Sequence, residues 1–256
     1  EASMFAERVG GRPFVRLVVP SRGCTLDRRG FCTMCNYGHG GFTGWDAAVG
    51  SVGRALAAWS GVGGTLLVSP AGSMLDEREV PASARRAILS RVATTNFDRV
   101  IVESRAEFVS LDVLAECQEI LGDKQLVLEL GLESSDPWVL KYCVNKGLNP
   151  DRVAEAITAS AAVGVPVTVN VSLGTAMLSP REAIEDAVAT TRWALDVGAS
   201  DIVVFPLLVR EWTVLAELWR LGLHHVPSLW SLVEVLERLG PSRVGKVSIA
   251  WYRDYD

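Results

Sequence analysis

The stretch Cys24-Thr-Leu-Asp-Arg-Arg-Gly-Phe-Cys32-Thr-Met-Cys35 places three cysteines in one short loop, at C-x7-C-x2-C spacing. It follows the apolar run Phe14-Val-Arg-Leu-Val-Val-Pro20, which predicts a strand. The cysteines therefore come just past the C-terminal end of that strand, where α/β barrels build their active sites. This position predicts a barrel of parallel strands with a functional site at the loop.

Three thiolates on such a loop can hold three irons of a 4Fe-4S cluster and leave the fourth iron without a protein ligand. An iron with an open coordination position indicates chemistry on a bound small molecule. We therefore interpret Cys24, Cys32 and Cys35 as the ligands of one cluster. The two remaining cysteines, Cys117 and Cys143, are too few to hold a second cluster.

A zinc site is the alternative for this loop. His39 extends the pattern to C-x7-C-x2-C-x3-H, a plausible tetrahedral set, and would make the chain a non-catalytic, zinc-stabilised binding protein. Zinc modules of that kind usually fold chains that cannot build a core of their own. A chain of 256 residues with 49% hydrophobic content can bury a core without metal, which favours the iron-sulfur interpretation.

The composition limits the partners that we expect. A net charge of −5 argues against a large surface for nucleic-acid phosphates. There is no uninterrupted apolar stretch of 18 residues and no signal-peptide pattern at the N-terminus, so we expect a cytoplasmic protein with no membrane partner. A reducing compartment also suits cysteines that serve as metal ligands rather than as disulfides.

Apolar runs and helical patterns alternate along the whole chain. The predicted strands are 14–20, 65–70, 99–104, 125–130, 165–172 and 201–206. The predicted helices include 45–59, 137–145, 150–163, 211–221, 228–239 and one that opens with the capping box Ser179-Pro-Arg-Glu182. Six strand-helix units require a parallel sheet, because each crossover contains a helix. The sequence predicts an α/β fold, a partial (β/α)6 TIM-like barrel of parallel strands with outer helices.

We expect one domain over residues 1–256, since no repeat, low-complexity tract or linker interrupts the pattern. Its cysteine loop covers residues 21–44, and its C-terminal part, 227–256, holds a helix and a candidate edge strand at 244–251.

Several local motifs occur in an order that resembles the radical S-adenosylmethionine (SAM) superfamily. Within it, the chain is similar to the branch that contains the radical SAM subunit of archaeosine synthase and is related to the radical SAM domain of the elongator acetyltransferase subunit. The motifs are Gly30-Phe-Cys32-Thr-Met-Cys35-Asn-Tyr37, Ala71-Gly-Ser-Met-Leu-Asp76 with Glu79-Val-Pro81, Val102-Glu-Ser-Arg105, Gly131-Leu-Glu-Ser134, Asn145-Lys-Gly147 and Pro227-Ser-Leu-Trp-Ser-Leu-Val-Glu-Val-Leu236.

The resemblance implies two cofactors, one 4Fe-4S cluster and SAM, and reductive cleavage of SAM to a 5′-deoxyadenosyl radical that abstracts hydrogen from an organic substrate. It also implies SAM contacts at eight positions. The methionyl amino group would meet backbone groups of Ala71, Gly72 and Ser73, because the glutamate usual there is absent, and the methionyl carboxylate would meet Lys146. The nucleoside part would meet Glu103, Glu133 and Asn170, with Met34 close to adenine. Each also has an ordinary structural alternative, such as a solvated charge or a space-filling methionine.

Cys143 is a candidate hydrogen-atom donor to a substrate radical. It precedes Lys146 by three residues on the predicted helix 137–145, so the two would share a face. The alternative, a small buried hydrophobic residue, is favoured. The adjacent pair His224-His225 is a weaker candidate for substrate contact.

The substrate and the reaction class, whether lyase, transferase or isomerase, are left open by the sequence. The resemblance implies a tRNA partner, cleavage of a C–N bond in a lysine adduct of a tRNA base, and a companion lysine-transferring protein. The acidic balance and the absence of a basic, aromatic-rich tail instead favour a small molecule or biosynthetic intermediate. An electron donor such as flavodoxin or ferredoxin is also implied.

Overall fold

The computed structural model describes residues 1–9, 11–39 and 41–250. Contacts along the chain divide it into two compact units. The first unit comprises Glu1–Arg29, Tyr37–Leu130 and Thr158–Val167, and the second comprises Gly30–Asn36, Gly131–Ile157 and the chain from Thr168 onward. The division runs through the cysteine loop, since Cys24 belongs to the first unit and both Cys32 and Cys35 belong to the second. The single-domain organisation expected from the sequence stays a prediction.

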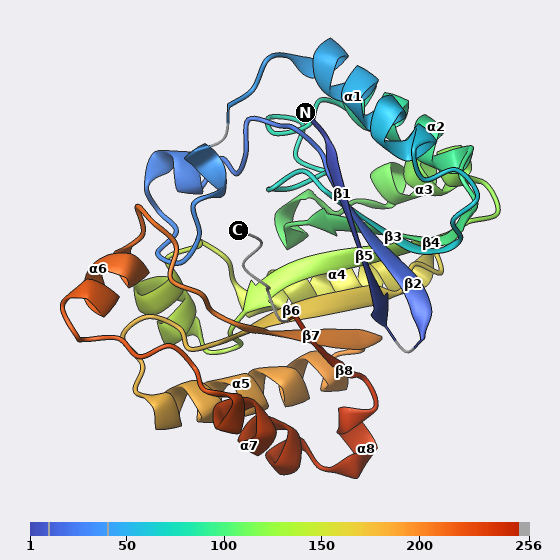
Figure 1. The fold of residues 1–256 in the computed structure, drawn as a ribbon. Coiled ribbons are helices and arrows are strands. Elements are labelled where there is room, and N and C mark those ends of the chain that lie inside the picture. The colour runs from blue at the N-terminus through green and yellow to red at the C-terminus, as the bar shows by residue number, and fades with distance from the viewer. Residues whose placement is uncertain (10, 40, 251–256) are drawn as a thin grey trace. The chain divides into compact units, whose positions relative to one another are not determined.

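The first unit contains a sheet whose strands are neighbours in chain order (Figure 1). Its strands are β1 (Ser3–Val9), β2 (Arg12–Val18), β3 (Gly64–Ser69), β4 (Phe97–Ser104) and β5 (Gln125–Glu133), whose last three residues belong to the second unit. β2, β3, β4 and β5 are parallel, as predicted, and register places Glu103 opposite Glu129. β1 pairs antiparallel with β2 and was not predicted, because five of its seven residues are exposed and carry no apolar pattern.

Consecutive buried apolar side chains along β3, β4 and β5 build the core of the first unit. Leu67, Ile101 and Val127 pack together on neighbouring strands, with Phe14 against them. The covering helices are α1 (Trp45–Ala57), α2 (Ala82–Ala93) and α3 (Leu111–Leu121), which lie side by side (Figure 1). α3 begins at the predicted cap Ser110, whose hydroxyl accepts a hydrogen bond from the backbone N–H of Val113. α4 (Pro150–Ala162) spans the boundary between the units.

The second unit repeats the parallel arrangement with fewer strands. They are β6 (Val167–Leu173), β7 (Asp201–Pro206) and β8 (Val247–Ile249), and all pairs are parallel. The helices are α5 (Pro180–Asp196), α6 (Val214–Arg220), α7 (Leu229–Leu239) and α8 (Pro241–Val244). α5 packs along α7 (Figure 1) and opens with the predicted capping box of Ser179 and Glu182. β8 realises the expected edge strand over part of 244–251, and Trp251 lies outside the described residues.

The helix predicted at 137–145 differs from the α-helix that we expected. The structure has a π-helix over Val139–Val144, which ends because Asn145 adopts the left-handed conformation with φ 53°. Lys146 therefore follows the helix instead of extending it, and the argument that it shares a helical face with Cys143 is wrong. Among the described residues, no helix is long and apolar enough to cross a membrane.

Candidate active site

Cys24 is the predicted cluster ligand that belongs to the first unit. Its thiol is half-buried, and burial raises its pKa above the ordinary value for a cysteine. The preceding Gly23 has φ 73°, and a Cβ at that position would stand 1.7 Å from the carbonyl oxygen of Tyr37. Only glycine therefore permits the backbone at position 23 to approach the carbonyl group of Tyr37 so closely.

The predicted SAM segment Ala71–Ser73 lies beside Cys24. A Cβ on Gly72 would stand 3.3 Å from the backbone nitrogen of Cys24, so the glycine allows the two backbones to meet. Ala71 holds φ 53°, a left-handed conformation that is costly for alanine and is found at functional sites. The hydroxyl of Ser73 lies 2.7 Å from that of Ser104 at the end of β4. The segment is thus fixed close to one predicted cluster ligand.

Glu103 lies on β4 in the first unit. Burial raises the pKa of its carboxyl group, although a hydrogen bond from the Ser69 side chain opposes that shift. The backbone oxygen of Glu103 accepts a hydrogen bond of 2.9 Å from the N–H of Met74. Glu103 is therefore close to the Ala71–Ser73 segment, as the predicted role requires, but its contact with SAM stays a prediction.

The second unit contributes the other two cysteines. The sulfur atoms of Cys32 and Cys35 are 3.6 Å apart. A hydrogen bond from Cys35 lowers the pKa of the Cys32 thiol to about 7, with burial opposing and the charge of Lys146 assisting. A pKa of about 7 makes a substantial fraction of Cys32 thiolate at neutral pH, and the thiolate is the form that binds metal.

The loop that carries these two cysteines rests on the end of the π-helix. Thr33 donates its hydroxyl proton to the carbonyl of Cys143 at 2.5 Å and its N–H to the carbonyl of Val144 at 3.2 Å. The Asn145 amide donates to the carbonyl of Phe31 at 2.7 Å. A π-helix is wider than an α-helix and is found frequently at functional sites. Here it supplies acceptors for the cysteine loop.

Lys146 and Glu133, both predicted SAM contacts, are bound to each other. The ammonium Nζ of Lys146 lies 2.9 Å from Glu133 Oε1 and 2.8 Å from the carbonyl of Gly131. Glu133 Oε2 accepts a hydrogen bond of 2.7 Å from Ser172, whose hydroxyl is 4.0 Å from the sulfur of Met34. A cluster in the second unit is therefore formed by Lys146, Glu133, Ser172 and Met34.

Met34 and Asn170 occupy the surroundings of this cluster. Met34 packs against the apolar group of Ala176, Leu207 and Leu215, so it also fills space, as the structural alternative stated. Asn170 is half-buried on β6, two residues before Ser172, and the two side chains therefore point to the same face of the sheet. Their proposed contacts with adenine and ribose stay predictions.

Cys143 is completely buried in the π-helix. Burial raises the pKa of its thiol, and nearby Asp186 adds to the effect. Asp186 accepts a hydrogen bond of 2.6 Å from Ser134, and burial raises its own pKa to about 6. Cys117, also buried, is a core residue as predicted, with its pKa raised to about 11 by burial.

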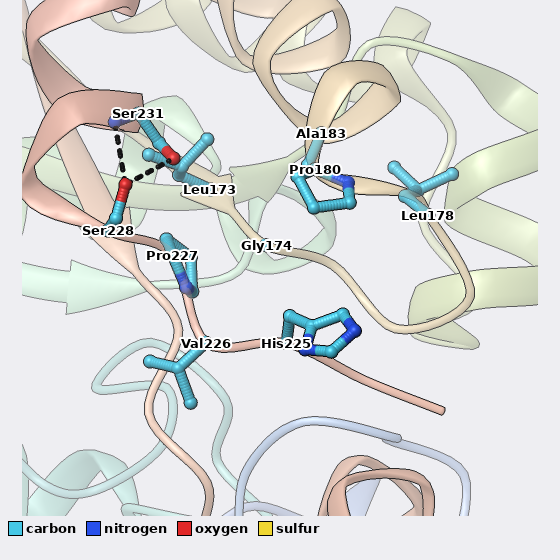
Figure 2. A pocket seen from close by; sticks show the side chains of 10 residues that line it. All are labelled: Leu173, Gly174, Leu178, Pro180, Ala183, His225, Val226, Pro227, Ser228 and Ser231. Atoms are coloured by element: carbon cyan, nitrogen blue, oxygen red, sulfur yellow. Dashed lines mark hydrogen bonds between the residues drawn. The ribbon is translucent and has the colours of Figure 1, made fainter. Parts of the chain in front are cut away.

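A pocket opens in the second unit where β6 ends (Figure 2). Its wall includes Leu173, Gly174 and the imidazole of His225, and Pro227 packs so closely on Gly174 that a Cβ there would stand 2.3 Å from the ring. His224 is buried, which lowers its pKa. Of the two histidines, His225 is the one placed to meet a ligand in this pocket.

Several residues of the site were missed by sequence reasoning. Glu79 and Arg105 belong to quoted motifs but received no role, and neither Thr33 nor Ser172 was singled out. The signal available for Glu79 and Arg105 was their position in the motifs Asp76-Glu-Arg-Glu79 and Glu103-Ser-Arg105. Thr33 and Ser172 carried no comparable signal, because a hydroxyl between cysteines or on a strand has many ordinary uses.

The donor chemistry of the site fits the predicted cofactors. Two thiols at 3.6 Å, one with its pKa lowered to about 7, suit an iron-sulfur cluster, and the largely buried cation of Lys146 suits a ligand that carries a carboxylate. His39, the fourth ligand of the zinc alternative, is exposed. In the described part of the chain, no group of three or more His, Cys, Asp or Glu side chains is gathered as for a metal ion, so the three-cysteine set stays a prediction.

Curated proteins with similar sequences are archaeal. The chain is 30% identical to the archaeosine synthase beta subunit of Thermococcus kodakarensis over 245 residues, which covers 90% of this chain and 74% of that protein. It is 29% identical to the corresponding subunit of Methanosarcina acetivorans over 229 residues, covering 87% and 65%. An uncharacterized protein of Methanocaldococcus jannaschii is 28% identical over 172 residues, covering 67% and 47%. The chain thus spans between about half and three quarters of these relatives. No family model matches it.

Solved structures share the fold of this chain. Methylornithine synthase (PylB) superposes with a TM-score of 0.62 at 15% identity, covering 92% of this chain and 63% of that one. Elp3 of Methanocaldococcus infernus gives 0.54 at 20% identity, covering 75% and 48%. The likeness confirms the predicted fold class, a partial TIM-like barrel of parallel strands with outer helices. The chain belongs to the family of archaeosine synthase beta subunits, among the radical SAM enzymes.

Proposed function

We propose that this chain binds one 4Fe-4S cluster through Cys24, Cys32 and Cys35, together with SAM, and starts radical chemistry on an organic substrate. When both are bound, reductive cleavage of SAM supplies a 5′-deoxyadenosyl radical that abstracts a hydrogen atom. The observation that carries the proposal is the pair of thiols at 3.6 Å, with the Cys32 pKa lowered to about 7, in a chain of this family.

The chain's own residues have the tasks of binding and orientation. Lys146 offers a cation for the methionyl carboxylate, and Glu133 holds that cation in place. The backbone of Ala71–Ser73 offers carbonyl groups for the methionyl amino group. Glu103, Asn170 and Met34 complete the nucleoside contacts, and Cys143 is kept as a candidate hydrogen-atom donor.

The test is formation of 5′-deoxyadenosine after anaerobic iron-sulfur reconstitution, with SAM and a strong reductant. We expect product from the unmodified chain and none from Cys32→Ala. A colourless protein that binds one zinc and forms no 5′-deoxyadenosine would instead support the zinc alternative. Replacing His39 by Ala separates the two further, because it removes a zinc ligand and leaves an iron-sulfur cluster intact.

For the substrate, the relatives support the archaeosine-type reaction on a tRNA base that the resemblance implies, and we propose it as the first to test. This reverses the preference for a small molecule that the net charge of −5 had suggested. A gel shift with tRNA should show binding that weakens steeply as the salt concentration rises, because phosphate contacts release counterions. Absence of such binding would return the preference to a small molecule. We also propose flavodoxin or ferredoxin as the class of electron donor.

A further inference from the structure

Glu79 is a buried carboxylate in the turn between β3 and α2, and its role was not predicted. Its side chain is 1% exposed. Oε1 accepts hydrogen bonds from the N–H and the hydroxyl of Thr25, both at 2.7 Å. Oε2 accepts from the N–H of Ser73 at 2.6 Å. One side chain therefore joins the residue after Cys24 to the last residue of the predicted SAM segment.

A buried carboxylate is costly unless it is paired with a cation and well hydrogen-bonded. Nη2 of Arg105 lies 3.5 Å from Glu79 Oε1 and 2.9 Å from Asp76 Oδ2, and it also donates to the hydroxyl of Thr25 at 3.3 Å. The guanidinium group of Arg105 stacks 4.8 Å from the ring centroid of Phe108. Arg105 is thus shared by Glu79 and Asp76, and Arg78 gives Asp76 a second cation through bonds to both of its oxygens. Hydrogen bonds to both of its oxygens fix the geometry of the Glu79 carboxylate.

The Glu79 carboxylate packs directly against Gly72 of the predicted SAM segment. A Cβ on Gly72 would stand 2.5 Å from Glu79 Oε2 and 3.4 Å from Cα of Cys24. Gly72 is therefore held between the Glu79 side chain and the Cys24 backbone. Any displacement of Glu79 would release both neighbours at once.

From these contacts we infer that Glu79 is a positioning residue, whose carboxylate fixes the backbone at Cys24 and the segment Ala71–Ser73 at a set distance from each other. This inference rests on the proposed function, which makes Cys24 a cluster ligand and Ala71–Ser73 a SAM contact. Glu79 contacts Thr25, Ser73 and Arg105. It acts through the two backbone segments that it joins.

The test compares Glu79→Gln with the exposed control Glu77→Gln, two residues away. A glutamine offers one acceptor oxygen in place of two, and its NH2 group would face an N–H donor, so the amide of Thr25 or of Ser73 loses its partner. Hydrogen exchange of the metal-free chain, read by mass spectrometry, should then be about tenfold faster in the peptides covering 22–27 and 71–75, since a lost buried hydrogen bond changes a local equilibrium by roughly that factor. Peptides of α5 should be unaffected, and Glu77→Gln should match the unmodified chain.

Equal acceleration in all peptides would mean that Glu79 only stabilises the fold, and unchanged exchange in a folded Glu79→Gln protein would also overturn the inference. Gly72→Ala provides a second route, because its methyl group displaces Glu79 Oε2, and it should accelerate the same two peptides. Since these measurements use the metal-free chain, their failure is distinguishable from failure of 5′-deoxyadenosine formation. In the reconstituted protein, Glu79→Gln should weaken SAM binding, whereas Glu77→Gln should leave it unchanged.

Discussion

Lys146 and Glu133 form an ion pair of 2.9 Å inside the second unit, with side chains only 13% and 9% exposed. Both were predicted as separate contacts to SAM, but the structure shows that each is also the other's partner. Removal of one therefore has two effects, one on the ligand and one on the residue left behind. A buried charge that loses its partner is destabilising even where the pair itself contributes little.

Lys146→Met should lower the free energy of unfolding by about 1–3 kcal/mol, because it leaves the Glu133 carboxylate without its cation. The double variant Lys146→Met with Glu133→Gln should recover most of that loss, since a neutral amide needs no cation. SAM binding should be weak in both variants. Thermal unfolding and calorimetric titration of the reconstituted protein measure the two effects separately. Tight SAM binding by the double variant would remove Lys146 from the set of ligand contacts.

Cys32 should be more reactive than Cys24, Cys117 and Cys143 in the metal-free chain near neutral pH. The thiolate is the reactive form, and its fraction rises as pH passes the thiol pKa, which is about 7 for Cys32 and raised by burial for Cys24 and Cys143. Alkylation of Cys32, followed by peptide mass spectrometry, should be half-maximal near pH 7. Cys35→Ala should move that midpoint upward, because it removes the hydrogen bond that lowers the pKa. A Cys32 midpoint unchanged in Cys35→Ala would contradict this account.

Prediction from sequence succeeded where burial leaves a pattern in the residues. The strand 201–206 matches β7, Asp201–Pro206, because its residues from Ile202 onward form a continuous apolar run in which every residue is buried or half-buried. β1 escaped prediction because its exposed residues carry no such run. The π-helix was not predicted either, since apolar spacing over six residues cannot distinguish it from an α-helix. It ends at Asn145, whose left-handed backbone accompanies a hydrogen bond to the distant Phe31 that local sequence does not indicate.

For the candidate site as well, the sequence indicated some features and not others. The cysteine spacing and the strand-end carboxylates indicated which residues to examine, because those residue types are costly in an apolar context without a use. Their partners could not be predicted. Glu79 bonds Thr25, which is 54 residues away, and Lys146 bonds Glu133 across 13 residues and a helix. Such pairings depend on how the turns fold, and no local pattern in one sequence records them.

Asp186→Asn should stabilise the protein at neutral pH. Burial raises the pKa of Asp186 to about 6, so the folded state holds its proton more tightly than the unfolded state, where the ordinary value is 3.8. Stability from this group is complete below pH 4 and is lost as pH rises through 6. At pH 7 the variant should be more stable by about 1–3 kcal/mol, and near pH 4 the difference should vanish. Chemical unfolding at the two pH values measures it. A difference that grows toward acid pH would have the wrong sign.

Asn145 should govern how firmly the chain keeps its second and third cysteines in place. Asn145→Gly retains the left-handed backbone, which glycine adopts freely, but removes the hydrogen bond to the carbonyl of Phe31. Asn145→Ala removes the same bond and adds strain of about 1 kcal/mol at φ 53°. If the bond holds the cysteine loop on the π-helix, both variants should lose iron to a chelator several-fold faster than the unmodified protein, and Asn145→Ala should be the less stable of the two variants because of its added strain. Asn149→Gly, an exposed change outside the loop, should leave iron loss unchanged, and the loss of its capping bond from the N–H of Asp151 should cost only about a few tenths of a kcal/mol. Iron loss at the unmodified rate in Asn145→Gly would show that the bonds of Thr33 to Cys143 and Val144 hold the loop without Asn145.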